Sequence, residues 1–172
     1  MTIVLSLSLE LIIFILPAWF ANAAPAFFSK FLPFRHPIDF GRNFIDGKRI
    51  LGDGKTLEGF ICGVVIGFIS GYILSIYGLH NLKGALALAL GSMIGDSLGS
   101  FIKRRLKYRR GQHAWFLDEL PFIITALIFF HFFNDKIILP VNAYPLMVII
   151  ILTFIAHNLT NFAYKQIIKM FS

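Results

Sequence analysis

The sequence predicts an all-α, polytopic membrane protein with five transmembrane helices in a single domain, residues 1–172. Apolar residues make up 57% of the 172 residues. The mean hydropathy is +0.75, and the apolar residues come in long runs. A soluble domain of this length has too little interior to bury 20 Phe, whereas a bilayer accepts them.

Five segments approach the roughly 20 apolar residues that a transmembrane helix needs. They cover about 3–24, 59–79, 84–102, 116–133 and 141–164. The polar run 134–136 separates the last two, and Pro140 marks the return of the chain. Pro121 is expected in the first turn of the fourth helix, where its missing N–H costs nothing.

The first segment also contains a pattern typical of secreted precursors. Ala21-Asn22-Ala23 resembles a signal-peptidase site after an apolar run. No basic residue precedes the run, however, and it is longer than the apolar part of an ordinary signal peptide. We therefore expect a retained helix.

The basic residues predict the orientation. Of the 16 Lys and Arg, six lie in the loop 25–58, six in the loop 103–115 and two in the C-terminal tail. Only Lys83 and Lys136 fall on the other side. Because cytoplasmic loops carry the excess of Lys and Arg, we predict a multi-pass protein of the cell membrane with its N-terminus outside and its C-terminus and both loops cytoplasmic.

A net charge of +7 is often a sign of nucleic-acid binding. Here the positive charge is confined to short loops between apolar segments. This placement favours phosphate-bearing lipid or nucleotide over nucleic acid, which we do not expect as a partner.

The first cytoplasmic loop has the composition of a phosphate site. Between Asp46 and Thr56 it interleaves Gly47, Gly52 and Gly54 with acidic and basic residues. Glycine lets backbone N–H groups approach a phosphate closely, and Lys and Arg neutralise its charge. The spacing is not that of a P-loop. A solvated loop with glycine turns is the alternative.

The third segment places a carboxylate inside the membrane. On a helix, Ser92, Asp96, Ser100 and Lys103 share one face. An intramembrane Asp is costly and indicates a functional site. The alternative is that Asp96 simply pairs with Lys103 or Arg104. The repeat of Gly91, Gly95 and Gly99 predicts close packing of a neighbouring helix.

Asp118 and Glu119 open the fourth segment from the same side. Mg²⁺ is commonly held by one or two carboxylates together with substrate phosphates, so Asp96 and Asp118 would suffice if they converge. The alternative is that the acidic pair only complements the helix dipole. On the fifth segment, Thr153, His157 and Asn161 share a face, which is more typical of interhelical hydrogen bonds.

Several ordered segments resemble a known family, the archaeal CTP-dependent CDP-archaeol synthases, distant relatives of the CDP-diacylglycerol synthases. The resemblance covers nearly the whole chain. Its segments are Asn22-Ala23-Ala24-Pro25, Ile38-Asp39 with Gly41, Asp46-Gly47-Lys48-Arg49, Gly52-Asp53-Gly54-Lys55-Thr56 with Glu58-Gly59, and Gly95-Asp96-Ser97 running to Ser100-Phe101-Ile102-Lys103-Arg104-Arg105. Where the family's fourth helix opens Asp-Gln-Leu-Asp-Phe, this chain reads Asp118-Glu119-Leu120-Pro121-Phe122.

The resemblance implies a Mg²⁺-dependent nucleotidyltransferase of phospholipid biosynthesis. Its substrates would be CTP and an ether-lipid phosphate, unsaturated archaetidic acid, and its products a CDP-lipid and pyrophosphate. Asp96, Asp118 and Lys103 would be catalytic, with Asp96 and Asp118 as the metal ligands. The expected CTP-binding residues are Asn22, Asp46, Gly47, Arg49, Asp53, Lys55, Thr56, Ser97, Ser100, Arg104 and Arg105.

Other classes remain open from the residues alone. A small multispanning glycerol-phosphate acyltransferase shares the glycine-rich basic loops but needs no metal. A transporter would string Asp96, His157 and Asn161 across the membrane. The CDP-alcohol phosphotransferases fit poorly, because Asp96 has no acidic neighbour at helical spacing on its own segment.

Overall fold

The computed structural model describes residues 2–28, 31, 34–108, 112, 114–133, 145–156 and 159. The described chain forms α1 (Thr2–Phe28), α2 (Leu57–Ile76), α3 (Leu82–Arg105) and α4 (Trp115–Phe133). A shorter apolar helix covers Pro145–Ala156. The four long helices are apolar enough to cross a membrane, which confirms a polytopic all-α fold. The other residues of the fifth predicted span, apart from 159, lie outside the described residues.

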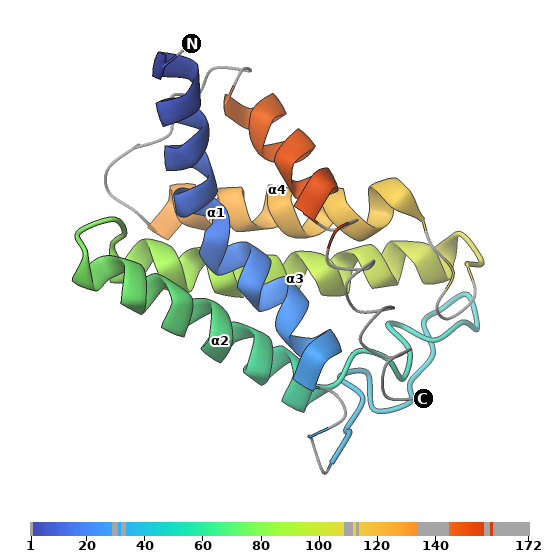
Figure 1. The fold of residues 1–172 in the computed structure, drawn as a ribbon. Coiled ribbons are helices and arrows are strands. Elements are labelled where there is room, and N and C mark those ends of the chain that lie inside the picture. Colours follow the sequence, from blue (N-terminus) through green and yellow to red (C-terminus); the bar gives the residue numbers. More distant parts are fainter. Residues whose placement is uncertain are drawn as a thin grey trace, which may run out of the picture.

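The helices pack around α3. Figure 1 shows α2, α3 and α4 side by side, with α1 crossing over them and the helix Pro145–Ala156 beside the first half of α1. One core cluster joins four of these helices through Ile15, Leu88, Phe122 and Ile149, all nearly inaccessible to solvent. This burial fixes which face of α3 meets each neighbour.

The predicted glycine stripe on α3 forms the contact with α4. A Cβ atom at Gly95 would lie 2.2 Å from the carbonyl oxygen of Pro121, and one at Gly99 would lie 2.6 Å from that of Leu117. Only a glycine surface lets the two backbones approach this closely. The prediction of close helix packing along this stripe is confirmed.

Pro121 lies inside α4 rather than in its first turn, so that prediction is wrong. The helix begins earlier, at Trp115, because the backbone of Ala114 forms hydrogen bonds with its first turn. The Ala114 carbonyl accepts from the N–H groups of Leu117 and Asp118, and the Ala114 N–H donates to the Asp118 carboxylate at 3.0 Å. Proline at 121 cannot donate to the Leu117 carbonyl, and that oxygen faces Gly99 instead.

Candidate active site

The loop between α1 and α2 is organised around one buried carboxylate, that of Asp39. It accepts hydrogen bonds from the N–H groups of Leu51 (2.9 Å) and Gly52 (2.8 Å) and from the Arg49 guanidinium (2.6 Å). Burial raises the pKa of Asp39, but the hydrogen bonds from Arg49, Gly52, Leu51 and Gly41 outweigh it and hold the pKa well below its usual range. Asp39 therefore stays ionised and fixes the path of the loop.

The backbone next to Asp39 is strained. Phe40 has a φ of +47°, a region that bulky side chains rarely adopt, and Gly41 follows at +78°. The Gly41 N–H donates to the Asp39 carboxylate at 3.1 Å, closing a local turn. The hydrogen bonds of Asp39 thus hold a conformation that the loop would not adopt alone.

Arg105 joins this loop to the end of α3. Its guanidinium donates to the carbonyl of Arg49 at 2.5 Å and lies 3.1 Å from a carboxylate oxygen of Asp46. It also lies 5.0 Å from the ring centroid of Phe44 and 4.9 Å from that of Phe101. Arg105 therefore connects two segments that lie far apart in the sequence.

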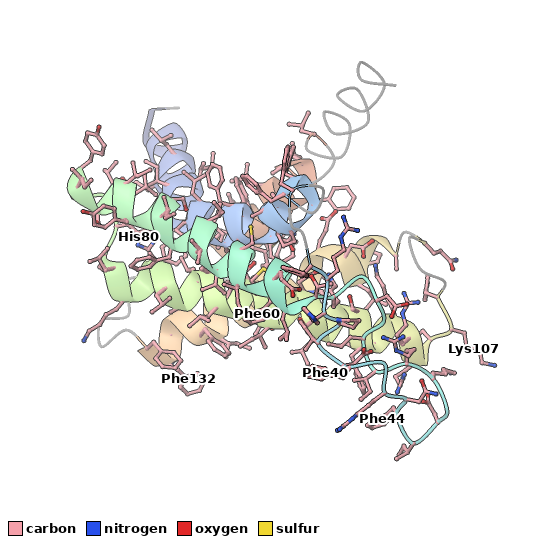
Figure 2. All side chains as sticks on the ribbon, turned by 90° about the horizontal axis from the view of Figure 1, so that it is seen from below. Phe40, Phe44, Phe60, His80, Lys107 and Phe132 are labelled. Carbon is pink, nitrogen blue, oxygen red and sulfur yellow. The ribbon has the colours of Figure 1, made fainter. Side chains whose placement is uncertain are left out.

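The joined loop and helix ends enclose a cavity of about 710 Å³. Polar side-chain atoms gather at this end of the bundle, around Phe40, Phe44 and Lys107, and away from His80 and Phe132 (Figure 2). The cavity has polar walls from the loop, α3 and the start of α4, and an apolar wall that includes Pro25, Phe60 and Met93.

Most of the predicted site residues converge on this cavity. Those that line it are Asn22, Arg49, Asp53, Lys55, Thr56, Asp96, Ser97, Ser100, Lys103, Arg104 and Asp118. Asp46, Gly47 and Arg105 are not among its lining residues. They belong to the joint between the loop and α3. Ser92, predicted on the face of Asp96, is buried and donates to the Ala18 carbonyl at 2.9 Å.

Two carboxylates and two ammonium groups form ion pairs in the cavity. Lys55 pairs with Asp96, and Lys103 pairs with Asp118. In this pair the partner of Asp96 is Lys55, which comes from the loop 41 residues earlier in the sequence. The four side chains are 15% to 25% exposed, so water screens their charges only partly.

The donors in this cavity fit a hard divalent cation. Asp96 and Asp118 supply carboxylate oxygens, the type of ligand that Mg²⁺ prefers, and the same cavity carries basic groups for phosphates. Within the described residues, no group of three or more His, Cys, Asp or Glu side chains could bind a metal by itself. A cation here would complete its coordination with water or substrate oxygens.

Glu119 faces away from this cavity. Its side chain is 6% exposed and lines a second, smaller cavity with Thr153 on the helix Pro145–Ala156. Pro121, at the position where the family pattern has a second Asp, packs on Gly95 and Gly99. His157 and Asn161 lie outside the described residues.

Sequence reasoning missed the organising role of Asp39, although the segment Ile38-Asp39 was noted. An Asp two residues before a Gly is a signal for a local turn, but nothing in the pattern shows that its carboxylate would be buried. Ile38, Phe60 and Met93, which line the apolar side of the cavity, were also missed. Their positions follow from tertiary packing.

Comparisons with known proteins identify the family of the chain. The family described as CarS-like, CDP-archaeol synthase, matches residues 4–171. The CDP-archaeol synthase of Pyrobaculum aerophilum is 42% identical over 147 residues, which cover 85% of this chain and 86% of that protein. The CDP-archaeol synthase of Methanocaldococcus jannaschii is 39% identical over 171 residues, covering 91% and 92%.

A solved structure shares the fold. It is described as an intramembrane enzyme for archaeal membrane lipids biosynthesis, and its chain is 34% identical to this one. The match covers 90% of this chain and 94% of the other with a TM-score of 0.76. Family, relatives and fold agree over nearly the whole sequence. This chain belongs to the CDP-archaeol synthase family.

Proposed function

We propose that this chain is a CTP-dependent cytidylyltransferase that activates an ether-lipid phosphate, unsaturated archaetidic acid, to a CDP-lipid in membrane phospholipid biosynthesis. The observation that carries the proposal is the single cavity in which Asp96, Asp118 and several basic side chains converge. The family relationship supplies the substrate class.

The reaction requires little proton chemistry. An oxygen of the lipid phosphate attacks the α-phosphorus of CTP, a new P–O bond forms, and the bond from the α-phosphorus to the bridging oxygen breaks. Pyrophosphate leaves with that oxygen. Because a phosphate monoester is largely ionised at neutral pH, the nucleophile needs no strong general base. Catalysis then rests on positioning and on stabilising negative charge.

The basic residues of the cavity are suited to these two tasks. Lys55, Lys103, Arg49 and Arg104 line it from the loop and from α3, so they can approach a triphosphate from two sides. Hydrogen-bonding groups for the remainder of the nucleotide come from Asn22, Asp53, Thr56, Ser97 and Ser100. Lys103 lies deepest of the paired cations, with 15% of its side chain exposed.

Asp96 and Asp118 would hold Mg²⁺. When bound, the ion would neutralise phosphate charge and help to orient the triphosphate. Asp118 is held in place for this role by the hydrogen bond from Ala114, which ties its carboxylate to the N-terminus of α4.

The loop residues outside the cavity lining have a positioning role in this proposal. Arg105 holds the backbone of Arg49 and the side chain of Asp46, and Gly47 turns the chain with a φ of +75°. The tie keeps Arg49, Asp53 and Lys55 over the cavity.

The lipid would enter from the bilayer, with its phosphate in the polar part of the cavity and its tails against the apolar helices. The apolar wall at Pro25, Phe60 and Met93 is compatible with this arrangement. The basic residues that line the cavity are Arg35, Arg49, Lys55, Lys103 and Arg104. Because cytoplasmic segments carry the excess of Lys and Arg, these residues support a site at the cytoplasmic face.

The test is product formation by the purified chain. The protein is incubated with labelled CTP, Mg²⁺ and an ether-linked lipid phosphate, and the lipid and pyrophosphate fractions are analysed. We expect a labelled CDP-lipid and one pyrophosphate for each product molecule. A second incubation contains an activated acyl donor and glycerol phosphate but no metal, and acyl transfer there would support the acyltransferase alternative instead.

A further inference from the structure

The two ion pairs in the cavity have a consequence for how ligands bind. Lys55 and Lys103 occupy carboxylate oxygens of Asp96 and Asp118, the groups that would hold the cation. A cation that uses these oxygens must displace the ammonium groups. The displaced ammonium groups lie in a cavity of about 710 Å³, within the usual range for small-molecule sites, and can turn to the phosphates of a nucleotide bound there.

We propose that Lys55 and Lys103 are exchangeable counterions, which neutralise the two carboxylates until a divalent cation replaces them and which then bind the phosphates of CTP. The proposal rests on the proposed function. It assigns to each lysine two successive partners, a carboxylate and a phosphate, where a simple phosphate-binding residue has one.

The charges of the four groups show why exchange is needed. Two ammonium and two carboxylate groups sum to zero, and Lys103 also interacts electrostatically with Lys55, Asp96 and Arg104. A divalent cation added alone leaves both lysines uncompensated beside Arg104. CTP added alone brings a polyanion towards two carboxylates. With both ligands, each positive charge has an anionic partner, so cation and nucleotide should favour each other's binding.

The backbone around the pairs suits such an exchange. Lys55 lies in a loop with Gly52 (φ +92°) before it, and its backbone is tied to Ile38 by a hydrogen bond of 2.9 Å. The backbone of Lys103 is part of α3. Exchange therefore needs only side-chain rotation, while both backbones stay in place.

The experiment measures cation and nucleotide binding separately on the full chain in nanodiscs, without lipid phosphate. Mn²⁺ is the probe for the cation site, and unbound Mn²⁺ is quantified by electron paramagnetic resonance. In Lys103→Met we expect Mn²⁺ to bind at least about tenfold more tightly, because its competitor for Asp118 is gone. Binding of labelled CTP in saturating Mn²⁺ should weaken by about tenfold, since a phosphate contact is lost.

Lys55→Met removes the competitor for Asp96, and we expect the same two changes in affinity. This variant replaces Lys103→Met if Lys103→Met fails to fold. Lys107→Met removes the same charge from an exposed position at the same end of the bundle and should change neither affinity more than about twofold. Lys83→Met removes it from the first turn of α3, at the opposite end, with the same expectation.

Opposite shifts of the two affinities support the exchange. Unchanged Mn²⁺ affinity in both lysine variants overturns it, even if CTP binding weakens, because the lysines would then be phosphate ligands alone. In that case a wild-type protein that still forms CDP-lipid leaves the proposed function standing. A wild-type protein that binds no CTP with Mn²⁺ and forms no CDP-lipid overturns both.

Discussion

Two neighbouring faces of α3 carry different residues and have different roles. One side carries Gly91, Gly95 and Gly99 and packs backbone to backbone on α4. The other carries Asp96, Ser100 and Lys103 and lines the cavity. On the first face, the absence of side chains allows the close contact with α4. On the second face, charged and polar side chains line the cavity. The difference predicts that substitutions one residue apart will fail in different assays.

The largest effect is expected at Asp96. Asp96→Asn removes a charged oxygen donor from the cavity but keeps the shape of the side chain. We expect CDP-lipid formation to fall by at least about 100-fold, with thermal stability close to that of the wild type. Initial rates with labelled CTP and a melting curve in detergent check both parts. If Asp96→Asn kept its activity, the assignment of Asp96 as a metal ligand would be wrong.

The pair Asp118 and Glu119 extends the comparison to α4. Asp118 lines the candidate active-site cavity, while its neighbour Glu119 faces the helix Pro145–Ala156. Asp118→Ala should abolish turnover, whereas Glu119→Gln should keep most of it, because only the first carboxylate can reach the nucleotide. Comparable losses of turnover would mean that the roles of the two carboxylates are misassigned.

The packing side of α3 should respond in stability. A methyl group at Gly95 would meet the Pro121 backbone, which cannot yield as a flexible side chain does. We expect Gly95→Ala to lower the free energy of unfolding by about 1–3 kcal/mol. Leu98→Ala, on the exposed part of the same helix, is the control and should cost clearly less. Reversible unfolding in mixed micelles measures the difference.

The joint at Arg105 should give a smaller effect on activity. Arg105→Lys keeps the charge but cannot contact Arg49, Asp46 and the two Phe rings in the same way. We expect the KM for CTP to rise about tenfold with little change in kcat, because the loop is held less firmly. Lys107→Gln is the control. An unchanged KM would show that the contacts of Arg105 are not needed to hold the loop.

The smallest effect is expected on the stability of the loop at low pH. The folded pKa of Asp39 is lowered, so its contribution to stability is complete above the unfolded pKa of about 3.9 and is lost as the pH falls towards the folded pKa. Protection of the loop from protease should therefore be constant between about pH 5 and 8 and decline only below about pH 4. The decline should disappear in Asp39→Asn, which has no charge to lose.

The sequence was sufficient for the two faces of α3 described above. The 3.6-residue period places Asp96 and Lys103 together, and the glycine repeat predicts the close approach of a neighbouring helix, which in the structure is α4. It was insufficient for the loop between α1 and α2, because no periodicity describes an irregular chain. The pairing of Lys55 with Asp96 and the burial of Asp39 depend on the tertiary path of that loop. Asp118 and Glu119 are neighbours on α4 and point in different directions around the helix. The sequence alone does not show which of the two faces the cavity.

The most direct test of the central claim compares wild type and Asp96→Asn in one assay with CTP labelled at the α-phosphate, Mg²⁺ and an ether-linked lipid phosphate. The account predicts a labelled CDP-lipid from the wild type and almost none from the folded variant. Wild-type protein without labelled lipid product, or a variant that makes as much as the wild type, would contradict it.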